Sequence, residues 1–255
     1  MLRRGGCSTP VRMTKHIGIL AHSAEGAALC FLTACHEGSA ALGTHQHPEI
    51  TMSTLPMGLS MPAWERGELA TVRKILADTA QRLAGARCDF WVCPDNTAHI
   101  ALEEPGPDYP LPGLHIADAV VTAARTRGFR RLGLLGTNWT MTGPVYRRAC
   151  ERAGLELRIP PEADRLMIHR VIFDELCNGR LLDASRAEYV RVISQLQAGG
   201  CDAVVLGCTE IPLLITPEVS PLPTLDSTRL LAQAAVEVAL GKKPLPTWRG
   251  GPAPV

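Results

Sequence analysis

The sequence is poor in aromatic residues and has almost no net charge. Only 4% of its 255 residues are Phe, Trp or Tyr, and 26 basic residues nearly balance 25 acidic ones. A net charge of +1 gives no field that would attract nucleic acid, an anionic membrane or a polyanionic substrate. No apolar run approaches the roughly 18 residues that a membrane-spanning helix requires. Residues 1–15 have no apolar core, so we expect a frayed leader and a cytoplasmic protein without nucleic-acid or membrane partners.

Signatures of metal and cofactor sites are also missing. The nine cysteines include no Cys-x-x-Cys pair and no Cys/His cluster at zinc-site spacing. No P-loop is present, and no Gly-x-Gly-x-x-Gly follows a predicted strand. The odd number of cysteines fits a reducing compartment. We therefore predict no metal and no nucleotide cofactor, and we interpret five cysteines as core or element-end thiols: Cys30, Cys88, Cys150, Cys177 and Cys201.

Short apolar runs alternate with amphipathic stretches of helical length, which is typical of parallel α/β proteins. Strands are expected near residues 16–21, 49–55, 88–93, 131–136, 156–159 and 202–207. Helices are expected near 25–42, 64–84, 116–127, 141–153, 164–177, 185–199 and 226–240. This pattern predicts an α/β fold of two similar Rossmann-like lobes with parallel sheets.

Two proline-rich stretches indicate where the lobes divide. Residues 104–113 break both periodicities and are expected to link the lobes, and residues 217–223 are expected to return the chain to the first one. The first lobe would comprise residues 1–114, completed by 224–255, and the second would comprise 115–223. The tail from residue 244 onward is expected to be irregular.

The chain also contains an internal repeat. Residues 88–97 (CDFWVCPDNT) align with residues 201–210 (CDAVVLGCTE) at a constant offset, and 17–21 (IGILA) echo 132–136 (LGLLG). This register sets Asp95 opposite Cys208, each just after an apolar run. Two similar halves that each end a strand with a proton-transferring residue predict a site in the cleft between them. Two-sided acid/base chemistry requires such an arrangement.

Small polar residues follow the predicted strands, at the ends where open α/β sheets bind ligands. The amides of the helices that follow could hold an anion, so we expect a small carboxylate substrate. The candidate substrate ligands are His22, Ser23, Asn96, Thr97, Thr137 and Thr209.

Three further residues are possible members of the site, and the sequence leaves their roles open. Cys93 is set opposite an apolar strand position by the repeat, which favours a structural thiol, and His99 is more typical of a packed histidine than of a base. Glu210 could orient Cys208 or cap a helix. Asp95 itself could be a base, a helix cap or both.

Four segments resemble the aspartate/glutamate racemase family: 96–99 (NTAH), 134–141 (LLGTNWTM), 168–172 (IHRVI) and 207–212 (GCTEIP). They occur in the order and at the spacing of that family, over most of residues 16–240. The resemblance implies a cleft between two α/β lobes, paired acid/base catalysis without pyridoxal phosphate and often a homodimer. The family usually has a cysteine before Asn-Thr-Ala-His, where this chain has Asp95. Residues 175–179 also lack the lysine expected to bind a distal substrate carboxylate.

An aspartate and a cysteine are poorly matched as proton carriers. Their ordinary pKa values differ by about 4.6 units, or roughly 6 kcal/mol. Two-sided transfer would need burial to raise the pKa of Asp95, or dipoles to lower that of Cys208. We predict a cofactor-independent racemase or epimerase of an amino acid or related α-substituted carboxylic acid, working between Cys208 and Asp95. Two alternatives stay open: a decarboxylase or cis–trans isomerase of a small dicarboxylic acid that uses Cys208 alone, and a non-catalytic small-molecule binding protein.

Overall fold

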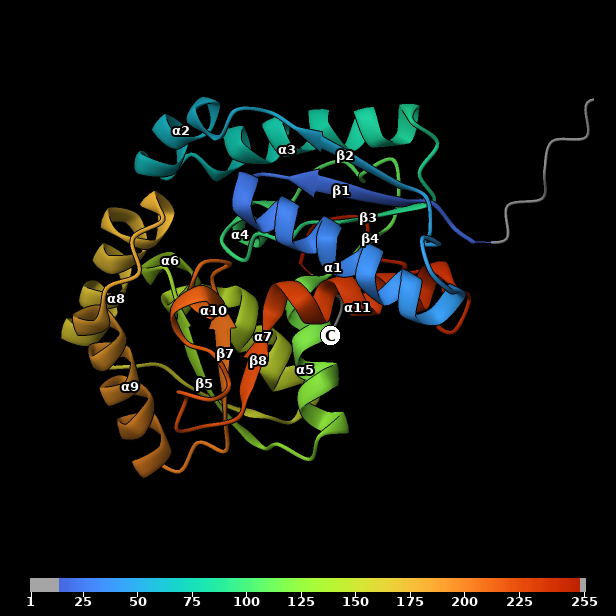
Figure 1. The fold of residues 1–255 in the computed structure, drawn as a ribbon. Coiled ribbons are helices and arrows are strands. Elements are labelled where there is room, and N and C mark those ends of the chain that lie inside the picture. Colours follow the sequence, from blue (N-terminus) through green and yellow to red (C-terminus); the bar gives the residue numbers. More distant parts are fainter. Residues whose placement is uncertain (1–13, 253–255) are drawn as a thin grey trace, which may run out of the picture.

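The computed structural model describes residues 14–252, which form two four-stranded parallel sheets, one above the other in Figure 1. The first sheet has the order β2-β1-β3-β4, and the second has the order β6-β5-β7-β8. The strands of the first sheet are β1 (Ile17–Ala21), β2 (Ile50–Thr54), β3 (Phe90–Val92) and β4 (Gly113–Leu114). Those of the second are β5 (Arg131–Gly136), β6 (Glu156–Arg158), β7 (Ala203–Gly207) and β8 (Thr224–Asp226). The second half of the chain thus reproduces the strand order of the first.

The internal repeat corresponds to the central strands of the two sheets. β3 pairs with β1, placing Val92 beside Ile19, and β7 pairs with β5, placing Val205 beside Leu134. Because all these strands are parallel, their carboxyl ends lie at one edge of each sheet. The residues that follow β3 and β7 therefore lie at equivalent positions, each at the carboxyl end of a central strand.

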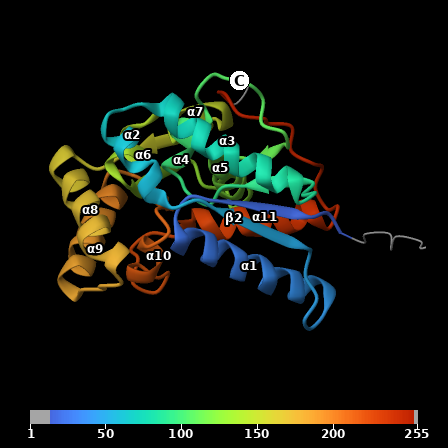
Figure 2. The same cartoon turned by 90° about the horizontal axis from the view of Figure 1, so that it is seen from above.

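Alternating residues of the first sheet enter two different hydrophobic layers. Ile19 and Val92 pack with α1 (Ala24–Leu42) and α11 (Ser227–Ala239). Leu20 and Trp91, on the other face, pack with α2 (Met61–Glu65) and α3 (Leu69–Gly85). Figure 2 shows α1 and α11 running alongside each other. The second sheet is packed by α5 (Ile116–Thr126), α7 (Pro144–Ala153), α8 (Glu162–Asp174) and α9 (Asp183–Ala198).

Short elements connect these layers near the strand ends. They are η1 (Met57–Leu59), α4 (Ala98–Leu102), α6 (Asn138–Thr142), η2 (Leu176–Asn178) and α10 (Ile211–Leu214). Within the described residues, no helix combines the length and the apolar character needed to cross a bilayer.

Three predicted helices are broken in the structure. Residues 64–84 divide into α2 and α3 at Gly67, whose φ of 71° lies in the left-handed region that favours glycine. Residues 141–153 divide into α6 and α7 before Pro144, which lacks the N–H that a continuous helix needs. Residues 164–177 give α8 and then the separate turn η2. The strands β4 and β8 were not predicted, because two or three residues are too few to show periodicity.

The predicted lobe limits remain a proposal, and the structure refines where each element packs. β8 pairs with β7 in the second sheet, whereas α11, which follows at once, packs in the core of the first. The C-terminal segment then lies along the linker at 104–113, where Gly113 N donates to Trp248 O at 2.7 Å. A Cβ at Gly113 would lie 2.4 Å from the Trp91 ring, so the close approach requires glycine. The predicted N-terminal leader lies almost wholly outside the described residues, as do residues 253–255.

Candidate active site

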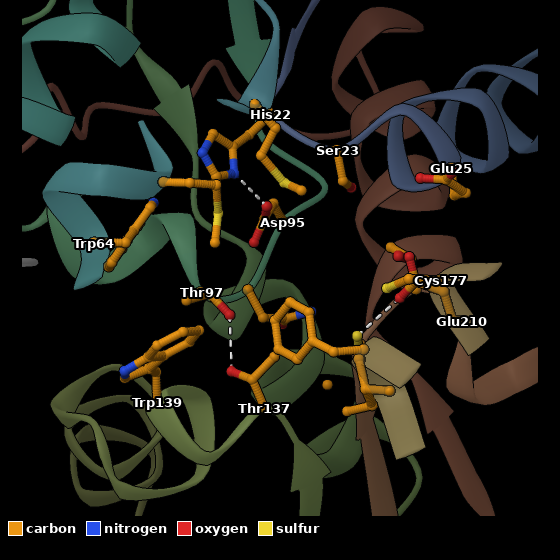
Figure 3. Close-up of a pocket in the computed structure, with 18 residues that line it drawn as sticks. His22, Ser23, Glu25, Trp64, Asp95, Thr97, Thr137, Trp139, Cys177 and Glu210 are labelled. Atoms are coloured by element: carbon orange, nitrogen blue, oxygen red, sulfur yellow. Dashed lines mark hydrogen bonds and ion pairs between the residues drawn. The ribbon is translucent and has the colours of Figure 1, made fainter. Parts of the chain in front are cut away.

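A cavity of about 230 Å³ lies between the sheets, at the carboxyl ends of their strands. Residues after β1, β3, β5 and β7 all contribute to its lining, so both halves of the chain form it. It contains all eight residues predicted as catalytic or substrate-binding: Cys208, Asp95, Asn96, Thr97, Thr209, Thr137, His22 and Ser23. Figure 3 shows the labelled members around this space.

On the first-lobe side, His22 and Asp95 form a close pair. His22 Nδ1 lies 2.6 Å from Asp95 Oδ2, and His22 Nε2 lies 2.9 Å from Ser60 Oγ (Figure 3 shows the pair). The Ser60 hydroxyl donates to the Met57 carbonyl at 2.9 Å, so it accepts from the His22 Nε2–H. A proton is therefore held at Nε2, and the proton between Nδ1 and Asp95 is the one that can be transferred.

The attraction within this pair exceeds the cost of burying it. Burial alone would lower the pKa of His22, but the charge of Asp95 and the hydrogen bond to it raise that pKa above its usual value. Burial alone would raise the pKa of Asp95, but His22 and the Ala98 amide hold it below its usual value. Asp95 Oδ1 accepts from Ala98 N at 3.1 Å, so the side chain also caps the start of α4.

On the second-lobe side, Cys208 donates a hydrogen bond to a buried glutamate. Cys208 Sγ lies 2.8 Å from Glu210 Oε2, and Glu210 is 3% exposed. Burial and the charge of Glu210 hold the pKa of Cys208 well above its usual value. The thiol is therefore protonated at neutral pH, with an acceptor already in contact. Glu210 makes no side-chain cap bond to α10, so the structure supports its orienting role over the capping one.

Hydroxyl groups meet where the two lobes touch. Thr97 Oγ1 lies 3.0 Å from the hydroxyls of both Thr137 and Thr140, which lie 3.1 Å from each other. The Thr97–Thr137 contact is drawn in Figure 3. Ser23 and Thr209 form no side-chain hydrogen bond with another residue that the structure describes, although both line the cavity. Their hydroxyls are available to a bound molecule.

Asn96 is buried, and its side chain is occupied within the protein. Its Oδ1 accepts from Tyr146 OH at 2.6 Å, and its Nδ2 donates to Ser227 Oγ at 2.9 Å. Ser227 in turn donates to Leu206 O. This set of bonds joins the end of β3 to α7, α11 and β7. Asn96 thus holds the lobes together, and only its remaining surface lines the cavity.

Tyr146→Phe tests this connection. The change leaves the buried Asn96 carbonyl oxygen without its donor, which costs about 1–3 kcal/mol of unfolding free energy. Urea unfolding followed by circular dichroism measures the loss. The control is Tyr189→Phe, which removes a 3.2 Å bond to a main-chain carbonyl inside the second lobe. An equal or larger loss in the control would contradict the special role of the Asn96 contact.

Two of the possible site residues do not line the cavity. Cys93 is fully buried in the hydrophobic layer under α3. His99 is also fully buried: its Nδ1–H donates to Asp95 O at 2.9 Å, and its Nε2 accepts from Ile116 N at 3.3 Å. Burial lowers the pKa of His99 to about 3, so the ring is neutral. Its hydrogen bond to the Asp95 carbonyl holds the main chain at Asp95 in position.

Sequence reasoning missed part of the cavity wall. Met57, Met61 and Trp64 reach it from the segment after β2, and Trp139 and Phe173 reach it from the second lobe. Of the two positions predicted for the Cys177 thiol, core or element end, the structure excludes the core. Cys177 is exposed and lines the cavity, because α8 ends at Asp174 and η2 turns the chain toward the site. Within residues 14–252, no group of three potential metal ligands comes together.

Comparison with known proteins places this arrangement in a family. The profile of the family described as Asp/Glu/Hydantoin racemase matches residues 24–235. The chain belongs to the Asp/Glu/hydantoin racemase family. The resemblance inferred from the four motifs is thereby confirmed, as is the prediction of an isomerase of the racemase type.

Several proteins of known name or structure align with most of the length of this chain. A candidate Asp/Glu racemase from Yersinia pestis is 31% identical, with a TM-score of 0.79 over 89% of this chain and 99% of that one. An aspartate racemase homologue from Pyrococcus horikoshii OT3 is 27% identical, with a TM-score of 0.75 over 88% and 99%. The broad specificity amino-acid racemase RacX of Bacillus subtilis (strain 168) is 22% identical over 66% of this chain and 73% of its own length. The structural matches confirm the predicted α/β fold of two lobes.

Proposed function

We propose that the protein interconverts the two configurations of an amino acid or a related α-substituted carboxylic acid, without a cofactor, by proton transfer on opposite faces of Cα. Cys208 with Glu210 serves one face, and Asp95 with His22 serves the other. One observation carries the proposal: two proton-carrying pairs, one from each lobe, line the same cavity.

The His22–Asp95 pair reduces the mismatch that the sequence alone implied. At their ordinary pKa values, an aspartate differs from a thiol by about 4.6 units, whereas an imidazole at about 6.5 and a thiol at about 8.5 differ by about 2 units. Because His22 and Asp95 share one mobile proton, they titrate as a unit rather than as a free carboxyl group. The pair can thus accept or donate a proton through an imidazole whose pKa lies above its usual value, rather than through a free carboxyl group.

In one direction, Glu210 takes the proton of Cys208, and the thiolate removes the proton from Cα. The shared proton of the His22–Asp95 pair is then delivered through Asp95 to the opposite face. The substrate passes through an enediolate, whose two oxygens need hydrogen bonds. The free hydroxyls of Ser23 and Thr209, with the amides at the strand ends, are suited to hold it. The reverse direction starts with Cys208 and Glu210 both protonated and the His22–Asp95 pair short of one proton; when Cys208 then protonates Cα, its thiolate takes the proton back from Glu210.

Glu210→Gln tests the pairing of Cys208 with Glu210. Removing the negative charge lowers the pKa of Cys208, so the rise of its alkylation rate with pH shifts to lower pH. The pKa stays above the ordinary value, because burial is the largest cause of the shift. Iodoacetamide labelling, read by mass spectrometry of the peptide that contains Cys208, measures it. Glu25→Gln, also in the cavity wall, should leave the Cys208 profile unchanged; an equal shift there would argue for a general field effect.

The decisive experiment is incubation in D₂O with a panel of L- and D-amino acids and small dicarboxylates, followed by NMR and chiral chromatography. Loss of the Cα–H signal with inversion supports the racemase. Exchange without inversion, or release of CO₂ from a dicarboxylate, would favour chemistry by Cys208 alone. Binding without exchange would favour a non-catalytic binding protein.

We further propose that the protein works as a cytoplasmic homodimer on a small carboxylate, without nucleic-acid or membrane partners. Family membership supports the substrate class. Sedimentation equilibrium tests the dimer, and fractionation of the native host tests the location.

A further inference from the structure

Aromatic side chains form one wall of the active-site cavity. Trp139 and Phe173 of the second lobe lie 6.1 Å apart, edge to face, and Trp64 of the first lobe lies 6.3 Å from Trp139. In a chain with only 11 aromatic residues, three line this one cavity. Met57, Met61 and Ile172 complete the apolar lining.

The charges around the cavity have one dominant sign. Among the described residues that line it, there is no lysine and no arginine, whereas Glu25, Asp95 and Glu210 each contribute a carboxyl group. The one possible cation is His22, which is already paired with Asp95. A second carboxylate on the substrate would be buried without a partner and would face like charges, which is strongly unfavourable.

The two tryptophans and two of the three described acidic residues that line the cavity lie on opposite sides of it. Figure 3 shows Trp64 and Trp139 on one side and Glu25, Cys177 and Glu210 on the other. Of the three acids, Asp95 is bound by His22 and Ala98, and Glu210 is bound by Cys208. The carboxylate of Glu25 therefore remains to bind the α-ammonium group of a substrate. With the ammonium toward Glu25 and the carboxylate at the strand ends, the side chain points toward the aromatic wall.

We infer that the substrate carries a bulky, uncharged apolar side chain, such as an aromatic ring or a thioether, and that acidic amino acids are poor substrates. This inference rests on the proposed racemase function, whose site it uses. A basic side chain is also disfavoured, because, of the described acids that line the cavity, Glu25 and Glu210 lie opposite the aromatic side and Asp95 is paired with His22.

The test compares kcat/KM for racemisation of L-phenylalanine and L-methionine with that for L-aspartate, L-glutamate and L-lysine. We expect the apolar pair to be favoured at least 10-fold. A higher kcat/KM for aspartate, glutamate or lysine would overturn the inference while leaving the racemase function intact.

Binding gives a readout that does not depend on turnover. Trp64 and Trp139 line the cavity, whereas the other tryptophans, Trp91 and Trp248, are buried in the core of the first lobe. Phenylalanine should therefore change tryptophan fluorescence at concentrations where aspartate does not. If no amino acid is racemised but phenylalanine still binds selectively, the proposed function fails and the inference about the pocket stands. Binding of aspartate in preference to phenylalanine would overturn it.

Two variants sharpen the assignment. Trp139→Ala should lower kcat/KM for phenylalanine at least 10-fold but change that for L-alanine, whose side chain is too short to reach the wall, less than 3-fold. Equal losses for both substrates would contradict a side-chain role for the wall. Met57→Arg adds a cation at an exposed position of the apolar lining, and we expect it to raise kcat/KM for glutamate relative to phenylalanine at least 10-fold. Met57→Gln, which is neutral, should not; if it raised the ratio as much as the arginine, charge would not be the cause.

Discussion

Cys208→Ser is expected to lower kcat for racemisation by about 10³-fold, within the range that a positioned acid or base contributes. A serine hydroxyl is a far weaker acid than a thiol, so Glu210 cannot form the alkoxide that would replace the thiolate. The hydroxyl still fits the space and can still donate to Glu210, so the fold and the cavity are retained. Chiral chromatography of timed reactions measures the loss.

The matched control is Cys35→Ser, a thiol of intermediate exposure on α1 that does not line the cavity. It should keep kcat within about 2-fold of the unaltered protein. If Cys208→Ser kept a tenth or more of the activity, the thiol would not be the proton carrier on its face, and the assignment of Cys208 would be wrong.

Asp95→Asn is expected to lower racemisation by about 10²–10³-fold, because the amide cannot carry the proton shared with His22. The substitution keeps the shape of the side chain, and its amide oxygen can still accept from Ala98 N, so the cap on α4 remains. Proton exchange on the Cys208 face should survive. One enantiomer should therefore exchange its Cα–H in D₂O without inversion, while the other becomes inert.

Asp78→Asn, on the exposed surface of α3, is the control for the charge change and should leave the rate unaltered. Retention of full racemisation in Asp95→Asn would show that Asp95 is only a helix cap. Loss of exchange for both enantiomers would mean that the two faces do not act independently.

The central strands and their ends could be predicted from the sequence. The apolar runs of β3 and β7 are fully buried. The constant offset between the two repeats aligns Asp95 with Cys208, each just after one of these strands. Parallel pairing then requires that residues after neighbouring strands lie together. Together with the predicted cleft between the lobes, this accounts for the eight residues predicted as catalytic or substrate-binding all lining one cavity.

The partners of those residues could not be predicted in the same way. His22 is fixed by Ser60, which belongs to the turn between η1 and α2, and no periodicity encodes the position of such a turn. Glu210 follows Cys208 by two residues, but only the folded geometry shows that it raises the pKa of the thiol. The break of α8 before Cys177 similarly depends on packing.

The hydrogen bonds around Asn96 have a consequence for how molecules reach the site. These hydrogen bonds connect the two lobes. Separating the lobes at Asn96 would therefore expose several buried hydrogen-bonding groups at once. The segment 57–65, which lines the cavity with Met57, Met61 and Trp64, carries no such bonds to the second lobe among the described residues. Opening the cavity at this segment is therefore expected to break fewer buried side-chain hydrogen bonds than separating the lobes at Asn96.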